Sequence, residues 1–152
     1  SGKPYLICYF LHKKLFREEF AIAQKIAKSR SLELKVINAR FGPNSFRKGT
    51  VFDAGPREFV NLIANASYVC TDSFHGTLFS LIFHKQFSCL DTKQNHHDTR
   101  KKGLLESVGA TAAYQNIEDP LKICSTLDYK EIDCRMEETR KSAAKFLEIL
   151  DE

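Results

Sequence analysis

The 152-residue sequence has no apolar run approaching the roughly 18 residues of a membrane-spanning helix, so we expect no membrane span. No secretory signal, internal repeat or low-complexity segment is visible. The net charge is only +4, and the basic residues do not gather into the stripe typical of nucleic-acid-binding proteins. These absences argue against a membrane or nucleic-acid partner and leave an ordinary globular domain.

The sequence also lacks a Cys-x-x-Cys motif. Its cysteines are odd in number and widely spaced, at Cys8, Cys70, Cys89, Cys124 and Cys134. The first three lie within apolar, strand-like runs, where thiols usually act as small buried hydrophobes. This usage favours a reduced, cytoplasmic setting over an exported, disulfide-bonded one.

The length suits a single domain with a real hydrophobic core, and residues 1–152 are expected to form that domain. The chain begins Ser1-Gly2 rather than with methionine and reaches a predicted strand almost at once. We therefore expect it to be part of a longer protein, whose other half would contribute to the functional site.

Apolar runs alternate with helical patterns along the chain. Lys3 to Leu11 predicts a strand buried on both faces, and the alternation from Leu32 to Asn38 predicts a second strand, with a helical pattern between them. We expect further strands at 67–71, 86–90 and 112–114, and further helices from Pro56, at 76–84, at 100–108 and after Asp128. This alternation predicts a doubly wound, mostly parallel, Rossmann-like α/β domain.

Local signals set several boundaries. The stretch from Asn38 to Ala54 is rich in glycine, proline and polar residues and is predicted to be a loop. Gly109 suits a left-handed helix C-cap, and Asp128-Tyr-Lys-Glu131 reads as a capping box. The helix that follows is expected to be part of the core along its whole length, through Ile132, Met136, Thr139, Ala143, Phe146 and Leu150.

The segment from Tyr68 to His84 predicts the functional site. An apolar run leads into Thr71, polar residues and glycine follow, and a second apolar run begins after Thr77. This order indicates a buried strand, a sharp turn and a buried helix. Asp72, Ser73 and His75 would then lie at the carboxyl end of a strand and beside a helix N-terminus, where ligands and anions bind.

Each residue of this turn has a functional and a structural interpretation. His75 is a candidate acid or base, or it caps the turn. Asp72 could orient His75 or bind a sugar hydroxyl, although Asp72 and Ser73 are also typical N-cap residues. Gly76 allows a close approach of the backbone. The Thr77 hydroxyl could bind an anion or satisfy the first helical turn.

Basic residues elsewhere are weaker candidates. Arg100 is expected near the same sheet edge, or else in solvent with Lys101 and Lys102. Arg57 and the Gly55-Pro56 turn could line a cleft or simply start a helix. A mobile loop carrying Arg40, Arg47 and Lys48 could close over an anionic ligand. His96-His97-Asp98 lacks further ligand spacing, so we expect no metal.

One block resembles a known family. Thr71-Asp-Ser-Phe-His-Gly-Thr-Leu-Phe-Ser80, preceded by Gly55-Pro-Arg-Glu-Phe59 and Asn65-Ala66, is similar to the polysaccharide pyruvyl transferase family, and in particular to its bacterial branch with a Thr-Asp-Ser-Phe-His-Gly signature. Arg100 ahead of Leu104-Leu105, and Ser142 with Phe146-Leu147, fit as well. The resemblance covers nearly the whole chain, but only the carboxyl-terminal half of a family member.

The resemblance implies a transferase with two Rossmann-like halves, similar to the GT-B glycosyltransferases, and an active site between them. Such an enzyme moves a pyruvyl group from phosphoenolpyruvate to two hydroxyls of a sugar or lipid-linked saccharide, forming a cyclic ketal in exopolysaccharide synthesis. It would need no cofactor, and the partner of this chain would be the amino-terminal half of the same protein. His75 would be the proton donor or a phosphate ligand.

The sequence departs from other branches of that family at the turn. They carry Ser-Arg-Leu-His, whereas Ser73 and Phe74 stand here in place of the arginine and leucine. Either Arg100 or Arg57 supplies the missing cation, or the donor is a different anion. Two alternatives therefore stay open: a GT-B-type glycosyltransferase that uses a nucleotide-sugar, and a non-catalytic domain that binds anionic glycans or a protein.

Overall fold

The computed structural model describes residues 2–38, 49–52, 54–92, 99–117 and 126–150. These residues build a six-stranded sheet from β1 (Tyr5–Tyr9), β2 (Glu33–Asn38), β3 (Thr50–Phe52), β4 (Tyr68–Thr71), β5 (Phe87–Asp91) and β6 (Tyr114–Asn116). The strand order is β3-β2-β1-β4-β5-β6, and every pairing is parallel. The predicted doubly wound, mostly parallel α/β fold is confirmed.

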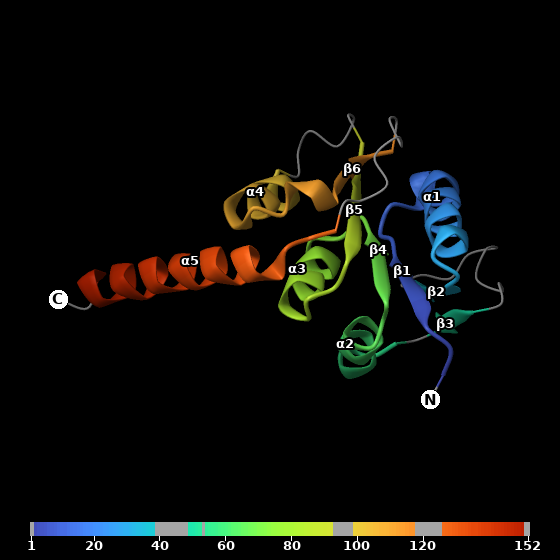
Figure 1. Ribbon diagram of the computed structural model, residues 1–152, viewed down its shortest axis with the longest axis horizontal. Helices are drawn as coiled ribbons and strands as arrows, with labels where there is room; N and C mark the ends of the chain where they lie inside the picture. Colours follow the sequence, from blue (N-terminus) through green and yellow to red (C-terminus); the bar gives the residue numbers. More distant parts are fainter. Residues whose placement is uncertain (1, 39–48, 53, 93–98, 118–125, 151–152) are drawn as a thin grey trace.

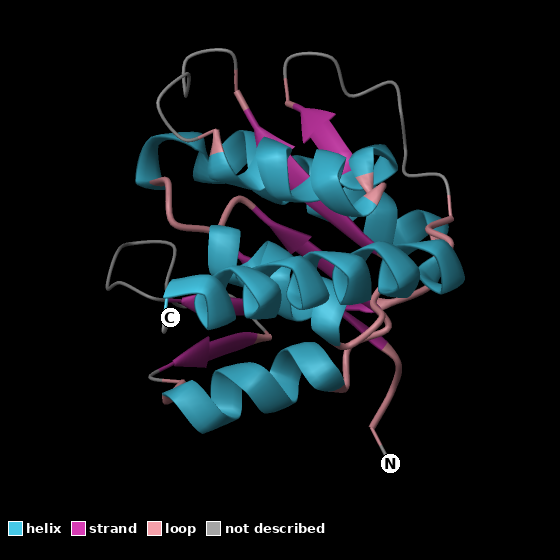
Figure 2. Ribbon diagram, turned by 90° about the vertical axis from the view of Figure 1, so that its left-hand side faces the viewer, coloured by secondary structure: helices cyan, strands magenta, loops and turns pink. Residues whose placement is uncertain are grey.

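Helices cover both faces of the sheet. They are α1 (Phe16–Ser29), α2 (Pro56–Ala64), α3 (Phe74–Ile82), α4 (Arg100–Val108) and α5 (Tyr129–Leu150), with short 3-10 turns at Lys13–Leu15 and Thr111–Ala113. Figure 1 shows α1 on one side of the sheet and α2 to α5 on the other. Figure 2, viewed from the side of α2 to α5, shows helices lying in front of the strands.

The central strands are apolar on both faces because helices pack on both. Ile7, Val69 and Cys89 point into the core beneath α2, α3 and α4, whereas Cys8 and Cys70 point into the core beneath α1. All five side chains are fully buried. The expectation that these three cysteines act as buried hydrophobes is confirmed.

Two strand predictions need correction. Thr50–Phe52 was expected to belong to a loop but forms β3, which pairs in parallel with β2. Gly49 makes this possible because it adopts φ +88°, and a Cβ there would lie 2.4 Å from the Leu34 carbonyl oxygen. The edge strand expected at 112–114 lies instead at Tyr114–Asn116, because Thr111–Ala113 forms a 3-10 turn.

The prediction that the last helix is part of the core along its whole length is wrong. Ile132 is buried and Met136 is half-buried, but residues 137–145 are exposed, including Thr139 and Ala143. Figure 1 shows why: α5 contacts the body only through its first turns and then extends away from it. Amphipathic spacing indicates a helix with an apolar stripe, but it does not show how much of that stripe is covered.

The predicted start of α2 and end of α4 agree with the structure, whereas α3 runs from Phe74 to Ile82 rather than over the predicted 76–84. Gly109 is the C-cap of α4 with φ +72°, and Gly55 is the N-cap of α2 with Pro56 at the first helical position. Asp128 Oδ1 accepts a hydrogen bond from the Lys130 amide, at 3.0 Å. Among the described helices, none combines the length and apolar character that crossing a bilayer requires.

Candidate active site at the carboxyl edge of the sheet

The strand order puts a topological switch point between the carboxyl ends of β1 and β4, where open parallel sheets have a crevice. The two strands are neighbours in the sheet, with Tyr9 beside Thr71 at their last paired residues. The chain leaves β1 for α1 on one face and leaves β4 for α3 on the other. Such a switch point is where open parallel α/β sheets bind ligands.

Asp72 joins the two sides of this crevice. Its side chain is only 1% exposed. Oδ1 accepts a hydrogen bond from the Leu11 amide at 2.7 Å, and Oδ2 accepts one from the His12 amide at 2.9 Å. Oδ2 also lies 2.6 Å from Nδ1 of His12. Because an ionised carboxylate only accepts, Nδ1 of His12 donates in this contact.

Glu19 brings a second carboxyl group to the same place from α1. The residue is only 1% exposed. Burial, followed by the nearby charge of Asp72, raises the pKa of Glu19 to about 9, although Lys101 opposes the shift. Glu19 therefore keeps its proton at neutral pH and shares a hydrogen bond with Asp72. The ligand atoms of His12, Glu19 and Asp72 all lie within 4.8 Å of one another.

Lys101 closes the buried side of the crevice. It is only 1% exposed, and its Nζ donates to the carbonyl oxygens of Asp72, at 2.7 Å, and Leu90, at 3.2 Å. Nζ also lies 3.8 Å from Oδ2 of Asp91 at the end of β5. The alternative in which the basic run at residues 100–102 lies wholly in solvent is therefore wrong for Lys101.

The turn after β4 is held by its own hydroxyl groups. Ser73 is the N-cap of α3, and its Oγ accepts a hydrogen bond from the Gly76 amide at 3.4 Å. Thr77 is fully buried, and its hydroxyl donates to the Ser73 carbonyl at 2.9 Å, so it satisfies the first helical turn. Gly76 is needed because a Cβ would lie 2.4 Å from Oγ1 of Thr71.

His75 lies exposed in the first turn of α3. Its ring is 5.9 Å from the ring of Phe74, and Cζ of Arg100 lies 5.3 Å from the centre of the same Phe74 ring. The half-buried Phe74 thus contacts both a histidine and an arginine at the carboxyl edge of the sheet. The structure brings Arg100 to the predicted turn, as expected from its place after β5.

Asp72 and Arg57 do not make the contacts with the turn that their functional interpretations would require. The hydrogen bonds of Asp72 described above run to Leu11 and His12, so its carboxylate positions His12 rather than His75. Gly55 and Arg57 are exposed at the start of α2. Their helix approaches the edge through Phe59, whose ring is 4.7 Å from that of Tyr9. Among the described residues, no hydrogen bond or ion pair links Arg57 to the turn.

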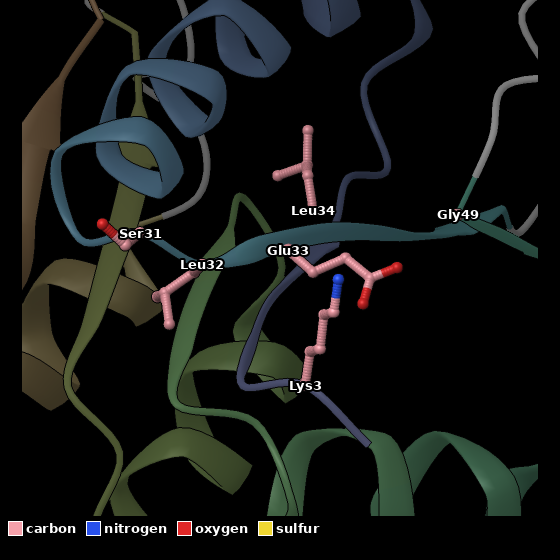
Figure 3. A pocket seen from close by; sticks show the side chains of 6 residues that line it. All are labelled: Lys3, Ser31, Leu32, Glu33, Leu34 and Gly49. Atoms are coloured by element: carbon pink, nitrogen blue, oxygen red, sulfur yellow. The ribbon is translucent and has the colours of Figure 1, made fainter.

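A second pocket lies away from this site and is a weaker candidate for ligand binding. Figure 3 shows its lining side chains, which come from Lys3 and from the turn and strand start at Ser31, Leu32, Glu33 and Leu34, together with Gly49. These residues precede or begin β1, β2 and β3, so the pocket lies at the amino edge of the sheet. Ligands of parallel α/β sheets bind at the opposite edge.

Comparison with known families gives a match. The pattern described as polysaccharide pyruvyl transferase matches residues 7–94, which run from β1 through β5. The chain belongs to this family. The matched segment contains His12, Glu19, Asp72 and His75, whereas Arg100 and Lys101 lie beyond it. No curated protein and no solved structure matches the chain.

Sequence reasoning missed three residues of the site in this family member. His12 directly follows the first apolar run, which is where a residue of the carboxyl edge should lie. Glu19 falls between Phe16 and Ala23 on the buried stripe of α1, and Lys101 precedes Leu105 by one helical turn. For Glu19 and Lys101, the sequence signal that could have indicated a site residue was a charged side chain on the apolar stripe of a helix. Arg40, Arg47, Lys48, His96, His97 and Asp98 lie outside the described residues.

Proposed function

We propose that this chain is the donor-binding, carboxyl-terminal half of a pyruvyl transferase that uses phosphoenolpyruvate. The observation that carries the proposal is the exposed His75 at the N-terminus of α3, with Cζ of Arg100 5.3 Å from the centre of the neighbouring Phe74 ring. Both residues lie beside the switch point of a parallel sheet in a member of a transferase family.

The charges of this edge suit an anionic donor. The first amides of α3 have no partner within the helix, and the positive end of its dipole faces the same side. Arg100 adds a guanidinium, the side chain best suited to bind a phosphate or carboxylate. These groups would hold the phosphate and carboxylate of phosphoenolpyruvate, while Ser73 itself carries no charge.

The proposed reaction begins with a proton transfer. His75 gives a proton to the methylene carbon of the donor, which makes the neighbouring carbon electrophilic. A sugar hydroxyl attacks that carbon and loses its proton, and phosphate leaves as the carbon–oxygen bond breaks. A second hydroxyl then closes the ketal. The net change is one pyruvyl group transferred and one phosphate released, with no oxidant or cofactor required.

In this proposal, the acceptor comes from outside the chain. The amino-terminal half of a longer, GT-B-like protein would close over the carboxyl edge and bind a sugar or lipid-linked saccharide. Transfer would take place in the cytoplasm, at a step of bacterial exopolysaccharide synthesis before export. The chain alone would bind the donor without turning it over.

Phosphate release tests the role of His75. In a protein that joins this chain to its amino-terminal half, His75→Ala should reduce acceptor-dependent phosphate release by at least about 100-fold, the usual size of general acid catalysis. His84→Ala is the matched control, because His84 is an exposed histidine just beyond the other end of α3 that pairs with Asp133. Activity retained by His75→Ala would remove His75 from the mechanism.

A nucleotide-sugar glycosyltransferase is the competing function. A helix N-terminus at the switch point of a sheet in the order 3-2-1-4-5-6 also suits a nucleotide pyrophosphate. Ser73, in place of an arginine, favours such a donor. The two functions differ in which donor stabilises the chain.

A further inference from the structure

We propose that His12, Glu19 and Asp72 form a binding site for one divalent transition-metal ion, such as Zn²⁺ or Mn²⁺. The site offers one imidazole nitrogen and two carboxylate oxygens, all within 4.8 Å of one another. Ions of this class bind such ligands at about 2.0–2.2 Å, so donor atoms around one ion lie about 3–4.4 Å apart. Small side-chain movements therefore suffice to close the site around an ion.

The second observation is an unpartnered oxygen. Oε2 of Glu19 is buried and has no hydrogen-bond partner in the part of the chain that the structure describes. The whole residue is 1% exposed and lies beside the Asp72 carboxylate. Buried polar atoms nearly always have a partner, so an unpaired carboxyl oxygen in such a place needs an explanation. A metal ion supplies the missing partner.

The local charge leaves room for a dication. Lys101 is the nearby buried cation, but its Nζ bonds two carbonyl oxygens and lies 3.8 Å from Asp91. The negative charge of Asp91 therefore offsets the positive charge of Lys101. The carboxylates of Glu19 and Asp72 remain, and together they carry two negative charges when both are ionised. A divalent ion neutralises both and is then the largest charge in the crevice.

The structure gives a rigid side and an adjustable side to this site. Asp72 is fixed by the Leu11 and His12 amides, which is the kind of support that orients a metal ligand. The His12 side chain is 41% exposed, so an ion can enter from its side. His12 Nδ1 and Asp72 Oδ2, now 2.6 Å apart, would separate to about 3 Å as the Nδ1 proton moves to Nε2.

The donor set selects the kind of metal. A nitrogen ligand beside two carboxylates favours Zn²⁺ or Mn²⁺, whereas Mg²⁺ and Ca²⁺ prefer oxygen ligands alone. The remaining positions on the ion would take water or an anionic ligand. This inference differs from the expectation of no metal that the His96-His97 motif gave. It also does not rest on the proposed function, because it concerns metal binding by the chain alone.

Calorimetric titration of the metal-free chain tests the site without any donor or acceptor. Zn²⁺ or Mn²⁺ should bind at one ion per chain, and Mg²⁺ should bind at least tenfold more weakly. Glu19→Gln keeps the shape of the side chain but weakens a carboxylate ligand, and should weaken binding by at least about 100-fold. His12→Gln should do the same, and because His12 is half-exposed this variant should fold normally.

Two controls make the outcome decisive. His84→Gln removes the exposed histidine that pairs with Asp133, and Cys134→Ser removes an exposed thiol. Neither should change the affinity. Co²⁺ bound to the chain should show visible d–d bands without thiolate charge transfer. Absence of binding, or binding unchanged by both Glu19→Gln and His12→Gln, would overturn the proposal and leave two carboxyl groups that share a proton.

Discussion

Nδ1 of His12 lies 2.6 Å from Oδ2 of Asp72, although 60 residues separate them in the sequence. Together with the amides of Leu11 and His12, this contact fastens the loop after β1 to the end of β4. One buried carboxylate therefore links the residues that follow β1 to the end of β4. Its removal should affect both stability and the neighbouring turn.

Asp72→Asn tests this contact. An asparagine presents an amide group to backbone donors that now face a carboxylate, so at least one buried donor loses its acceptor. We expect the free energy of unfolding to fall by about 2–3 kcal/mol in urea titrations. Asp133→Asn breaks the other His–Asp pair, whose side chains are about half exposed, and should cost less than about 1 kcal/mol. Equal losses would contradict this account.

Gly76 is predicted to be required by the packing of α3 against β4. A Cβ at this position would lie 2.4 Å from Oγ1 and 3.0 Å from Cβ of Thr71, whose hydroxyl is fixed by the Tyr9 carbonyl. Gly76→Ala should therefore destabilise the chain by at least about 2 kcal/mol. Gly103→Ala is the control, since Gly103 lies inside α4 with no atom within 4 Å of the added Cβ. That change should stabilise by about 0.5–1 kcal/mol, through helix propensity alone.

Glu19 should make the stability depend on pH. Its pKa in the folded chain is about 9, against 4.5 for an ordinary glutamate. Below the lower value both states are protonated, and the stability is fully present. As pH rises toward 9, the unfolded state releases its proton first, which lowers its free energy relative to the folded state and reduces the stability. Between pH 5 and 8 the loss should be on the order of 4 kcal/mol, at about 1.4 kcal/mol per pH unit.

Glu19→Gln should remove most of this pH dependence. The comparison is made by urea titration at several pH values in the presence of a chelator, so that no metal contributes. Glu18→Gln is the matched control because Glu18 is exposed on the same turn of α1 and is the smallest of the causes that raise the pKa of Glu19, so this change should leave most of the pH dependence in place. A wild-type chain whose stability is flat from pH 5 to 8 would show that Glu19 titrates normally.

The thiols should differ sharply in reactivity. Burial raises the pKa of Cys89 to about 11, and it raises the pKa values of Cys8 and Cys70 as well. Because the thiolate is the reactive form, these three should resist iodoacetamide in the folded chain. Cys134 is exposed on α5 and should be labelled quickly. Peptide mapping by mass spectrometry distinguishes the sites, and rapid labelling of Cys70 would contradict its burial.

The sequence was sufficient to predict the sheet because its strands are apolar on both faces. Ile7, Cys8, Val69 and Cys70 occur in short apolar runs that only a helix-covered parallel sheet explains. The same logic failed for β3, whose three residues are too few for a periodic pattern. It failed for α5 because the spacing of apolar residues does not tell whether another element covers them.

The site was predicted in part. His75, Ser73 and Arg100 were placed at the edge because each follows a predicted strand at a predicted helix start. Glu19 and Lys101 were not, because burial of a charge depends on partners distant in sequence, here Asp72 and Asp91. Asp72 was located correctly, but the roles considered for it were orienting His75, binding a sugar hydroxyl or capping a helix, and His12 was not among its expected partners. Only the pairing of β1 with β4 brings His12 to it.

Donor binding to the chain tests the central claim most directly. Thermal or urea unfolding is followed with phosphoenolpyruvate, with a set of nucleotide-sugars, and with neither. A donor at 100 times its dissociation constant should stabilise the folded chain by about 2.7 kcal/mol. We predict that phosphoenolpyruvate gives this stabilisation and that His75→Ala or Arg100→Ala reduces it. Stabilisation by a nucleotide-sugar, with none by phosphoenolpyruvate, would contradict the proposed function.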